Sequence, residues 1–139
     1  MSNVAEIFIE LRSKLTGAAA VTAIVPAARI LHGWPPDFAD AGFFPSMTFF
    51  QVSGLTPSVD QGPFRLFDGA LQLDLWGYDP DELCALEVAS RDALLAPGFA
   101  PTGWKESILR LGGTDYLFAQ ESQLHRRLMT VIVKASAEA

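Results

Sequence analysis

The chain has 139 residues, of which 50% are hydrophobic and 19% are charged, and its formal net charge is −6. This length predicts a single domain, residues 1–139, with its own hydrophobic core. The negative charge argues against a protein that wraps or reads nucleic acid, because both modes need a basic surface. With so few charged residues, much apolar surface stays uncovered, which favours self-association.

The acidic residues are concentrated in the middle of the chain. Residues 37–92 hold ten acidic and two basic residues, a net charge of −8, whereas the two flanks together carry +2. An acidic segment of this kind is either a solvated surface or a surface with a function, and the sequence leaves both interpretations open.

The first third of the chain predicts two helices and a short strand. Gly17 is expected to end the first helix, and residues 18–25 suit a second, short helix that stops at Pro26. Residues 28–31 suit a short edge strand, and residues 32–45 are rich in glycine and proline and predict a loop. The first helix is indicated by apolar residues that recur on one helical stripe, Val4, Ile7, Phe8, Leu11 and Leu15.

The middle of the chain predicts two strands and a long helix. Residues 46–53 and 67–78 read as strands that pair antiparallel, with residues 54–65 as a long hairpin tip. In the second strand apolar and polar residues alternate, Leu71, Leu73 and Leu75 with Gln72 and Asp74. Asp79 is placed to cap the helix that follows over residues 80–95.

The last third of the chain predicts two more strands. Residues 104–118 read as a strand with a bulge at the glycines 112–113, and residues 124–135 as the last strand, followed by a frayed tail over 136–139. The order of elements favours an α+β fold: an antiparallel sheet of about four strands, two main helices on one face, and a long protruding hairpin or loop over residues 53–67.

Residue types that carry chemistry are present without the spacing that chemistry needs. His32 and His125 are far apart and have no evident partners, so we expect structural or solvent-exposed roles. The acids at 79–82 fit a helix start better than a metal loop. Cys84 is expected to be a buried small hydrophobe, and no internal disulfide or cysteine metal cluster is possible. Asp74 points away from the leucines beside it in its strand and is expected to be exposed. We therefore expect no catalytic residue, no cofactor, no metal site and no enzymatic activity.

Adjacent side chains on strands give the first indication of contacts between subunits. Phe49 and Phe50 must face opposite sides of the sheet. One side is expected to meet the helices and the other a neighbouring subunit, unless one of the two rings simply lies under residues 32–45. Arg126 and Arg127 also face opposite sides, and one of them is expected to pair with an acid at a surface or interface.

In the order and spacing of its elements the chain resembles the tail-completion, or tail-terminator, proteins of long-tailed phages and prophages. The resemblance spans nearly the whole chain. The features that carry it are the helix ending Leu15-Thr16-Gly17, the alanine-rich turn to Val25, Arg29-Ile30, the loop reaching Phe44-Pro45, the strand from Met47 to Val52, the strand ending Leu73-Asp74-Leu75-Trp76, the helix from Asp79 to Leu95, and the strand from Arg127 to Val133.

The resemblance implies a structural virion protein of the tail or neck, assembled in the host cytoplasm. Such proteins form a ring, commonly of six subunits, that caps the tail tube, docks to the head connector or stopper protein, and lets DNA pass through its hole. They have no catalytic residues or cofactors and no membrane partner. A ring needs two different patches on each subunit that meet head to tail. An acidic channel repels phosphates, so DNA slides through it without sticking.

Candidate residues follow from the resemblance and the predicted strands. Those expected between subunits are Phe49, Phe50, Leu55, Val59, Phe64, Phe67, Arg126 and Arg127. Those expected to face the channel are Asp60, Asp68 and Asp74. Two alternatives stay open: another neck component, such as a head-completion or stopper protein, and a small ligand-binding or enzymatic α+β domain with a pocket near one of the histidines. The N-terminus has neither a signal peptide nor an apolar span, so we expect no membrane association.

Overall fold

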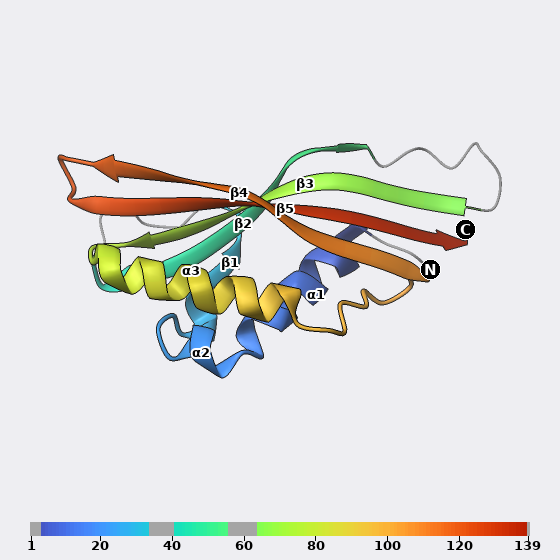
Figure 1. Ribbon diagram of the computed structural model, residues 1–139, viewed down its shortest axis with the longest axis horizontal. Coiled ribbons are helices and arrows are strands. Elements are labelled where there is room, and N and C mark those ends of the chain that lie inside the picture. The colour runs from blue at the N-terminus through green and yellow to red at the C-terminus, as the bar shows by residue number, and fades with distance from the viewer. Residues whose placement is uncertain (1–3, 34–40, 56–63, 139) are drawn as a thin grey trace.

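The computed structural model describes residues 4–33, 41–55 and 64–138, and within them three helices and five strands form one layered unit (Figure 1). The helices are α1 (Val4–Thr16), α2 (Ala19–Thr22) and α3 (Pro80–Leu95), with short 3-10 turns η1 (Ala27–Arg29) and η2 (Ala41–Phe43). The strands are β1 (Ile30–His32), β2 (Ser46–Leu55), β3 (Phe64–Gly77), β4 (Glu106–Ala119) and β5 (Leu124–Glu138).

The strands form one mixed sheet in the order β1-β2-β3-β5-β4. The predicted α+β class is confirmed, and the short edge strand is present as β1. The prediction of about four antiparallel strands was wrong in one respect, because β1 makes a fifth strand and pairs parallel with β2. A strand of three residues is too short for its direction to be read from alternation.

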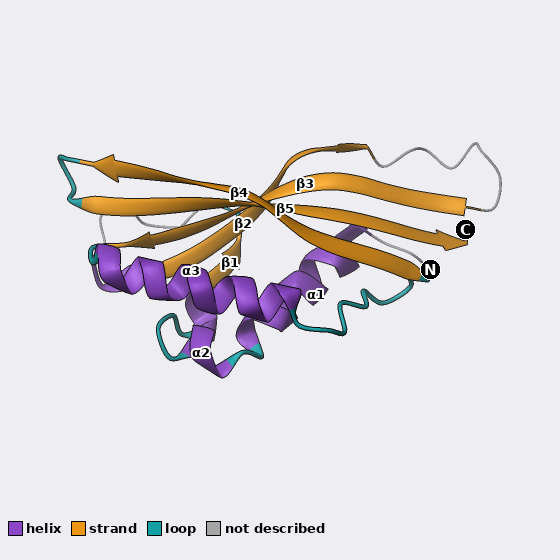
Figure 2. Cartoon of the chain, viewed as in Figure 1, coloured by secondary structure: helices purple, strands orange, loops and turns teal. Residues whose placement is uncertain are grey.

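All three helices lie on the same side of the sheet (Figure 2). Because Met47, Leu75 and Arg127 are register partners in β2, β3 and β5, alternate residues of these strands point to the same face. The main core lies between this face and the helices. It includes Ile7, Leu11 and Leu15 of α1, Leu83 and Leu86 of α3, and Met47, Phe49, Leu71, Leu73, Leu75, Met129, Val131 and Val133 of the sheet.

Hydrogen bonds from two side chains of α1 hold the helix layer together. Arg12 donates to the carbonyl oxygens of Ile30 at 2.9 Å and Ala27 at 2.8 Å, which ties α1 to the start of β1. Lys14 donates to the carbonyl of Ala96 at 2.6 Å, at the end of α3, where a cation also compensates the negative end of the helix dipole.

The joint between β3 and α3 has the predicted form. Asp79 caps α3, and its Oδ1 accepts hydrogen bonds from the backbone N–H groups of Asp81 at 2.9 Å and Glu82 at 3.4 Å. Gly77 lets the joint pack closely, since a Cβ there would lie 3.2 Å from the side chain of Leu83. The acids at the start of α3 therefore form a helix start, as expected.

The hairpin of β2 and β3 is antiparallel, as predicted, from the pair Ser46–Trp76 to the pair Leu55–Asp68. The expectation that residues 54–65 form only a hairpin tip was wrong, because β2 continues to Leu55 and β3 already begins at Phe64. The first residues of β3 pair with the end of β5 instead of with β2. Residues 56–63 of the predicted protruding loop lie outside the described residues.

The hairpin of β4 and β5 contains the predicted bulge. Its register shifts between Leu111 and Thr114, around Gly112 and Gly113. The frayed tail was a wrong expectation, because β5 runs to Glu138 and Ser136 pairs with both Glu106 and Leu66. Ladder bonds to strands on both sides keep these last residues in the sheet, although their side chains are small.

Candidate interaction surfaces

The phenylalanines predicted to lie between subunits have different positions. Phe49 and Phe67 are each only 1% exposed and belong to the main core. Phe50 is half-buried and points to the sheet face without helices. Leu55 and Phe64 are strand residues of β2 and β3, and Val59 lies outside the described residues. Their role between subunits stays a proposal.

The two neighbouring arginines of β5 face opposite sides of the sheet, and both form ion pairs within the chain. Arg126 lies 2.8 Å from Asp74 on the face without helices. Arg127 lies 3.5 Å from Glu87 of α3 on the helix face. The sequence predicted one such pair, and the structure contains two.

A buried polar cluster lies on the sheet face that carries no helix among the described residues. Asp74 was expected to be exposed, but it is fully buried. Its carboxylate accepts hydrogen bonds from Gln72 and Arg126, each at 2.8 Å. Beside it, the indole N–H of Trp76 donates to the hydroxyl of Thr48 at 2.9 Å. The strand alternation gave the correct face for Asp74 but did not reveal that this face is covered.

Aromatic side chains and an arginine pack beside this polar cluster. Trp76 packs in a small second core with Phe44 and Leu124, and the Arg126 guanidinium lies 4.6 Å from the centre of a Trp76 ring. Burial raises the pKa of the Asp74 carboxyl above its usual value, although the hydrogen bonds from Gln72 and Arg126 and the positive charge of Arg126 act to lower it. In the single chain Asp74 therefore has a structural role, because its buried side chain has no exposed surface that could face a channel.

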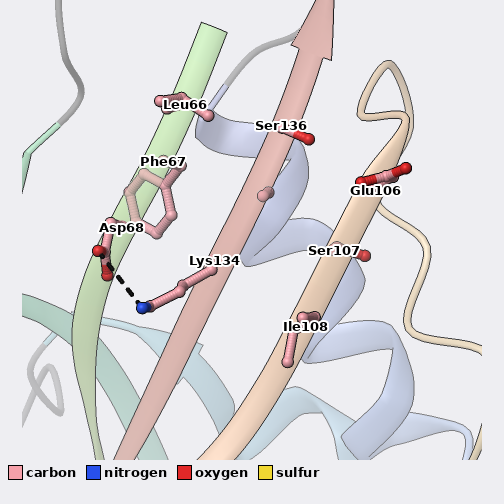
Figure 3. A pocket seen from close by; sticks show the side chains of 9 residues that line it. Leu66, Phe67, Asp68, Glu106, Ser107, Ile108, Lys134 and Ser136 are labelled. Atoms are coloured by element: carbon pink, nitrogen blue, oxygen red, sulfur yellow. Dashed lines mark ion pairs between the residues drawn. The ribbon is translucent and has the colours of Figure 1, made fainter.

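A groove crosses the same face of β3, β5 and β4 near the other end of the sheet (Figure 3). It has a volume of 220 Å³. Its apolar sides include Leu66 and Ile108, which are 51% and 62% exposed. Asp68 and Lys134 lie 3.9 Å apart on its floor in an exposed ion pair. Asp68 is thus accessible, and Asp60 lies outside the described residues, so the proposal of channel-facing acids depends on Asp68.

A second, larger groove of 350 Å³ lies between α1 and the β1 edge of the sheet. Aromatic rings form its base: His32 stacks between Phe8, at 4.4 Å between ring centres, and Phe49, at 5.3 Å. Ile9 is 57% exposed at its rim. The structural role expected for His32 agrees with this stacking. We call this surface the α1/β1 groove, and it is lined by Ala5, Phe8, Ile9, Arg12, His32 and Phe49.

An exposed aromatic cluster lies on the opposite edge of the sheet, in the β4–β5 hairpin. Tyr116 and Phe118 are each 43% exposed, and the residue between them, Leu117, is 50% exposed. His125 stacks against Phe118 at 4.5 Å and shares a hydrogen bond with the Tyr116 hydroxyl. The end of this hairpin extends past α3 (Figure 1). We call Tyr116, Leu117 and Phe118 the hairpin cluster.

Sequence reasoning missed the hairpin cluster. The signal was available, because three consecutive apolar residues in a strand place apolar side chains on both faces. The same argument had been applied to Phe49 and Phe50 in β2. The α1/β1 groove carried no comparable signal, since it joins residues from α1, β1 and β2 that are distant in the sequence.

The described residues contain no group of three or more His, Cys, Asp or Glu that could hold a metal ion. Among them, no helix is both long and apolar enough to cross a membrane. Cys84 was expected to be buried but is exposed. It directly follows the buried Leu83, and a step of one residue turns the side chain about 100° around the helix, off the buried face.

Comparison with solved structures gives a match over nearly the whole chain. A chain in the virion of a native gene transfer agent (GTA) particle superimposes with a TM-score of 0.59 at 14% identity, covering 97% of this chain and 93% of that chain. The two chains therefore share a fold.

Two further solved structures overlap with only part of this chain, at low TM-scores. Two chains from Akkermansia muciniphila, one of them determined without its transmembrane region, overlap with TM-scores of 0.27 and 0.25 at 11% and 12% identity. They cover 66% and 65% of this chain and 41% and 44% of their own length. No protein-family model and no curated protein matches the sequence.

Proposed function

We propose that this chain is a structural virion protein that forms a ring at the head–tail joint of a tailed particle. In this role it terminates the tail tube and docks the tube to the head connector, and DNA passes through the ring. The observation that carries the proposal is the shared fold over 97% of the chain with a component of a gene transfer agent virion. The element order that resembles tail-completion proteins supports the same role independently of that comparison.

The surfaces of the chain agree with assembly. Among the described residues, exposed apolar side chains gather at the hairpin cluster and at the groove of Leu66 and Ile108, and Ile9 is exposed at the rim of the α1/β1 groove. Monomeric proteins seldom expose such clusters, whereas a ring subunit buries them against its neighbours. The proposed ring has six subunits, with the tail tube protein on one side and the connector or stopper protein on the other. The net charge of −6 suits a conduit from which DNA phosphates are repelled.

A different neck component, such as a head-completion or stopper protein, is the second candidate. It accounts for the shared virion fold equally well and differs only in its position in the particle. An enzymatic role has less support. A ligand site needs several polar groups that converge on a pocket, and in the α1/β1 groove the Arg12 guanidinium is already engaged by two backbone carbonyls.

Disruption of the gene in a strain that produces the particles tests the proposal. We expect filled heads and free tails that do not join, with tails of irregular length, and complementation by the intact gene should restore joined particles. Electron microscopy of particles that carry a tagged copy should place the tag at the joint. Tags at the head side of the neck in particles with tails of normal length would favour the stopper protein. Normal particles from the disrupted strain would contradict both virion roles.

A further inference from the structure

We propose that copies of this chain associate head to tail through opposite edges of the sheet, with the hairpin cluster of one copy seated in the α1/β1 groove of the next. This inference rests on the proposed ring and identifies the two surfaces that would build it. It names a second copy of this chain as the occupant of the groove.

The sheet order places the two surfaces at opposite edges. In the order β1-β2-β3-β5-β4, the groove lies beside β1 and the hairpin cluster lies on β4. A closed ring requires two different patches per subunit, one at each side, since identical patches that meet each other give only a dimer. The chain offers such a pair: a groove at one edge and an apolar protrusion at the other.

The strand register places both surfaces at the same level along the strands. Successive register partners run across the whole sheet, in the order Tyr116, Arg127, Leu75, Met47 and Ile30. Tyr116 at one edge is therefore in line with Ile30 at the other, two residues from His32 in the groove. Repeating the molecule along this row brings the two surfaces together without a shift along the strands.

Strand direction and face agree with this contact. The pairings make β4 antiparallel to β1, so a neighbouring β1 approaches the free edge of β4 in an antiparallel sense. Tyr116 and Phe118 point to the helix face of the sheet, the face on which the groove lies. Because β1 has only three residues, side chains rather than ladder hydrogen bonds must supply most of the contact.

Charges at the two edges are complementary. Arg12 lines the groove and Arg29 directly precedes β1, and neither has an acidic partner among the described residues. Near the hairpin cluster, Asp115 and Glu121 are exposed. Arg126 and Arg127 of the same hairpin are already paired with Asp74 and Glu87 within the chain. Opposite charges at the rim orient the approach of two copies and disfavour hairpin-to-hairpin contacts.

Matched aspartate substitutions test the contact. Ile9→Asp introduces a charge at the groove, Phe118→Asp and Tyr116→Asp introduce one on the helix face of the hairpin, and Val88→Asp on α3 is the control. Val88 is 58% exposed, against 57% for Ile9, so both helix substitutions are equally compatible with the folded monomer. We expect the groove and hairpin variants to need about tenfold or more protein to form the oligomer, since each buries a charge in the contact. Light scattering after gel filtration measures the oligomer, and circular dichroism verifies the fold.

Cross-linking between copies tests the head-to-tail mode. In a Cys84→Ser background, Ile9→Cys protein and Phe118→Cys protein are treated with a short bis-maleimide, each alone and as a mixture. We expect cross-linked dimers from the mixture and none from either protein alone.

Each outcome decides between the two proposals. An oligomer that forms normally in all three test variants, or cross-links within one single-cysteine protein, would place the contact elsewhere and overturn this inference while the ring stands. A wild-type chain that is monomeric at every concentration, and absent from particles, would overturn the ring and this contact together.

Discussion

Asp74 is the residue on which the helix-free face of the sheet depends most. Its side chain is fully buried, and its ion-pair partner Arg126 is 19% exposed. The carboxylate is retained there by hydrogen bonds from two neighbouring strand residues, Gln72 and Arg126. Burying a charge is costly unless it is paired and hydrogen-bonded, so removing Asp74 takes from Arg126 one of the groups that compensate its charge.

We therefore expect Asp74→Ala to lower the free energy of unfolding by about 2–4 kcal/mol, because Arg126 then loses its carboxylate in a mostly buried site. Asp68→Ala is the matched control. It removes an acid from the same strand and face, but its ion pair with Lys134 is exposed on both sides, and such pairs contribute less than about 1 kcal/mol. Urea unfolding followed by tryptophan fluorescence measures both. Equal effects of the two substitutions would contradict the role assigned to Asp74.

The raised pKa of Asp74 predicts a dependence of stability on pH. Burial raises the folded pKa above the unfolded value of 3.8, so the folded state binds this proton more tightly than the unfolded chain does. The stabilising contribution of the protonated carboxyl is complete below 3.8 and is lost as the pH rises through the folded pKa. Asp74→Asn removes this contribution. The stability of the wild type relative to Asp74→Asn should fall as the pH rises through that window, and a constant difference would contradict the prediction.

Cys84 lies on the exposed side of α3 and should react as a free surface thiol. We expect the native protein to bind about one equivalent of a thiol reagent without denaturant, because access rather than unfolding limits the reaction. Mass spectrometry measures the adduct, and Cys84→Ser is the blank. Labelling that occurs only after addition of denaturant would show that Cys84 is covered, either in the chain or in its oligomer.

At the scale of elements, α3 depends on its first turn. Asp79 satisfies two backbone N–H groups that have no partner within the helix. Asp79→Ala should lower the free energy of unfolding by about 1 kcal/mol, and Asp79→Ser should retain most of the stability because serine also caps helices. Thermal melting under identical buffer conditions measures the two. A serine variant as unstable as the alanine variant would show that the cap is not the cause.

The elements could be predicted where their side-chain pattern is long and regular. The alternation of Leu71, Leu73 and Leu75 correctly predicted a strand, and the Asp79–Pro80 sequence correctly predicted the start of α3. The parallel pairing of β1 could not be predicted, because three residues hold too little pattern. The burial of Asp74 was also out of reach, since its partner Arg126 lies on β5, distant in the sequence.

The same distinction holds for the candidate surfaces. Of the residues predicted between subunits, Phe49 and Phe67 lie in the core, and Arg126 and Arg127 form ion pairs within the chain. Clusters of exposed apolar side chains depend instead on which strands and helices are left uncovered by other elements. Which strands lie at the edges of the sheet follows from the strand order. No local pattern in the sequence encodes that order, so the α1/β1 groove, and the position of the hairpin cluster at the opposite edge, emerge only from the fold.

At the scale of the whole molecule, an acid can stabilise the fold or, in the proposed ring, repel DNA from the channel wall, and Asp68 is suited to the second role. Asp68 is 62% exposed and contributes little to the fold. In the proposed ring an acid in this position helps to repel DNA phosphates from the channel wall. Replacing it with a base should therefore leave folding and assembly intact and change only the passage of DNA.

We expect particles with Asp68→Lys to form at normal yield and to deliver DNA less efficiently, because a cation in the channel attracts the phosphate backbone. Asp92→Lys is the control, since Asp92 is also an exposed aspartate and lies on α3, on the helix side of the sheet. The ratio of delivered genomes to filled particles measures the effect, and raised salt during delivery should reduce it by screening. If both variants deliver DNA as well as the wild type, Asp68 does not face the channel. If Asp92→Lys alone fails, the channel is lined by the helix side of the chain.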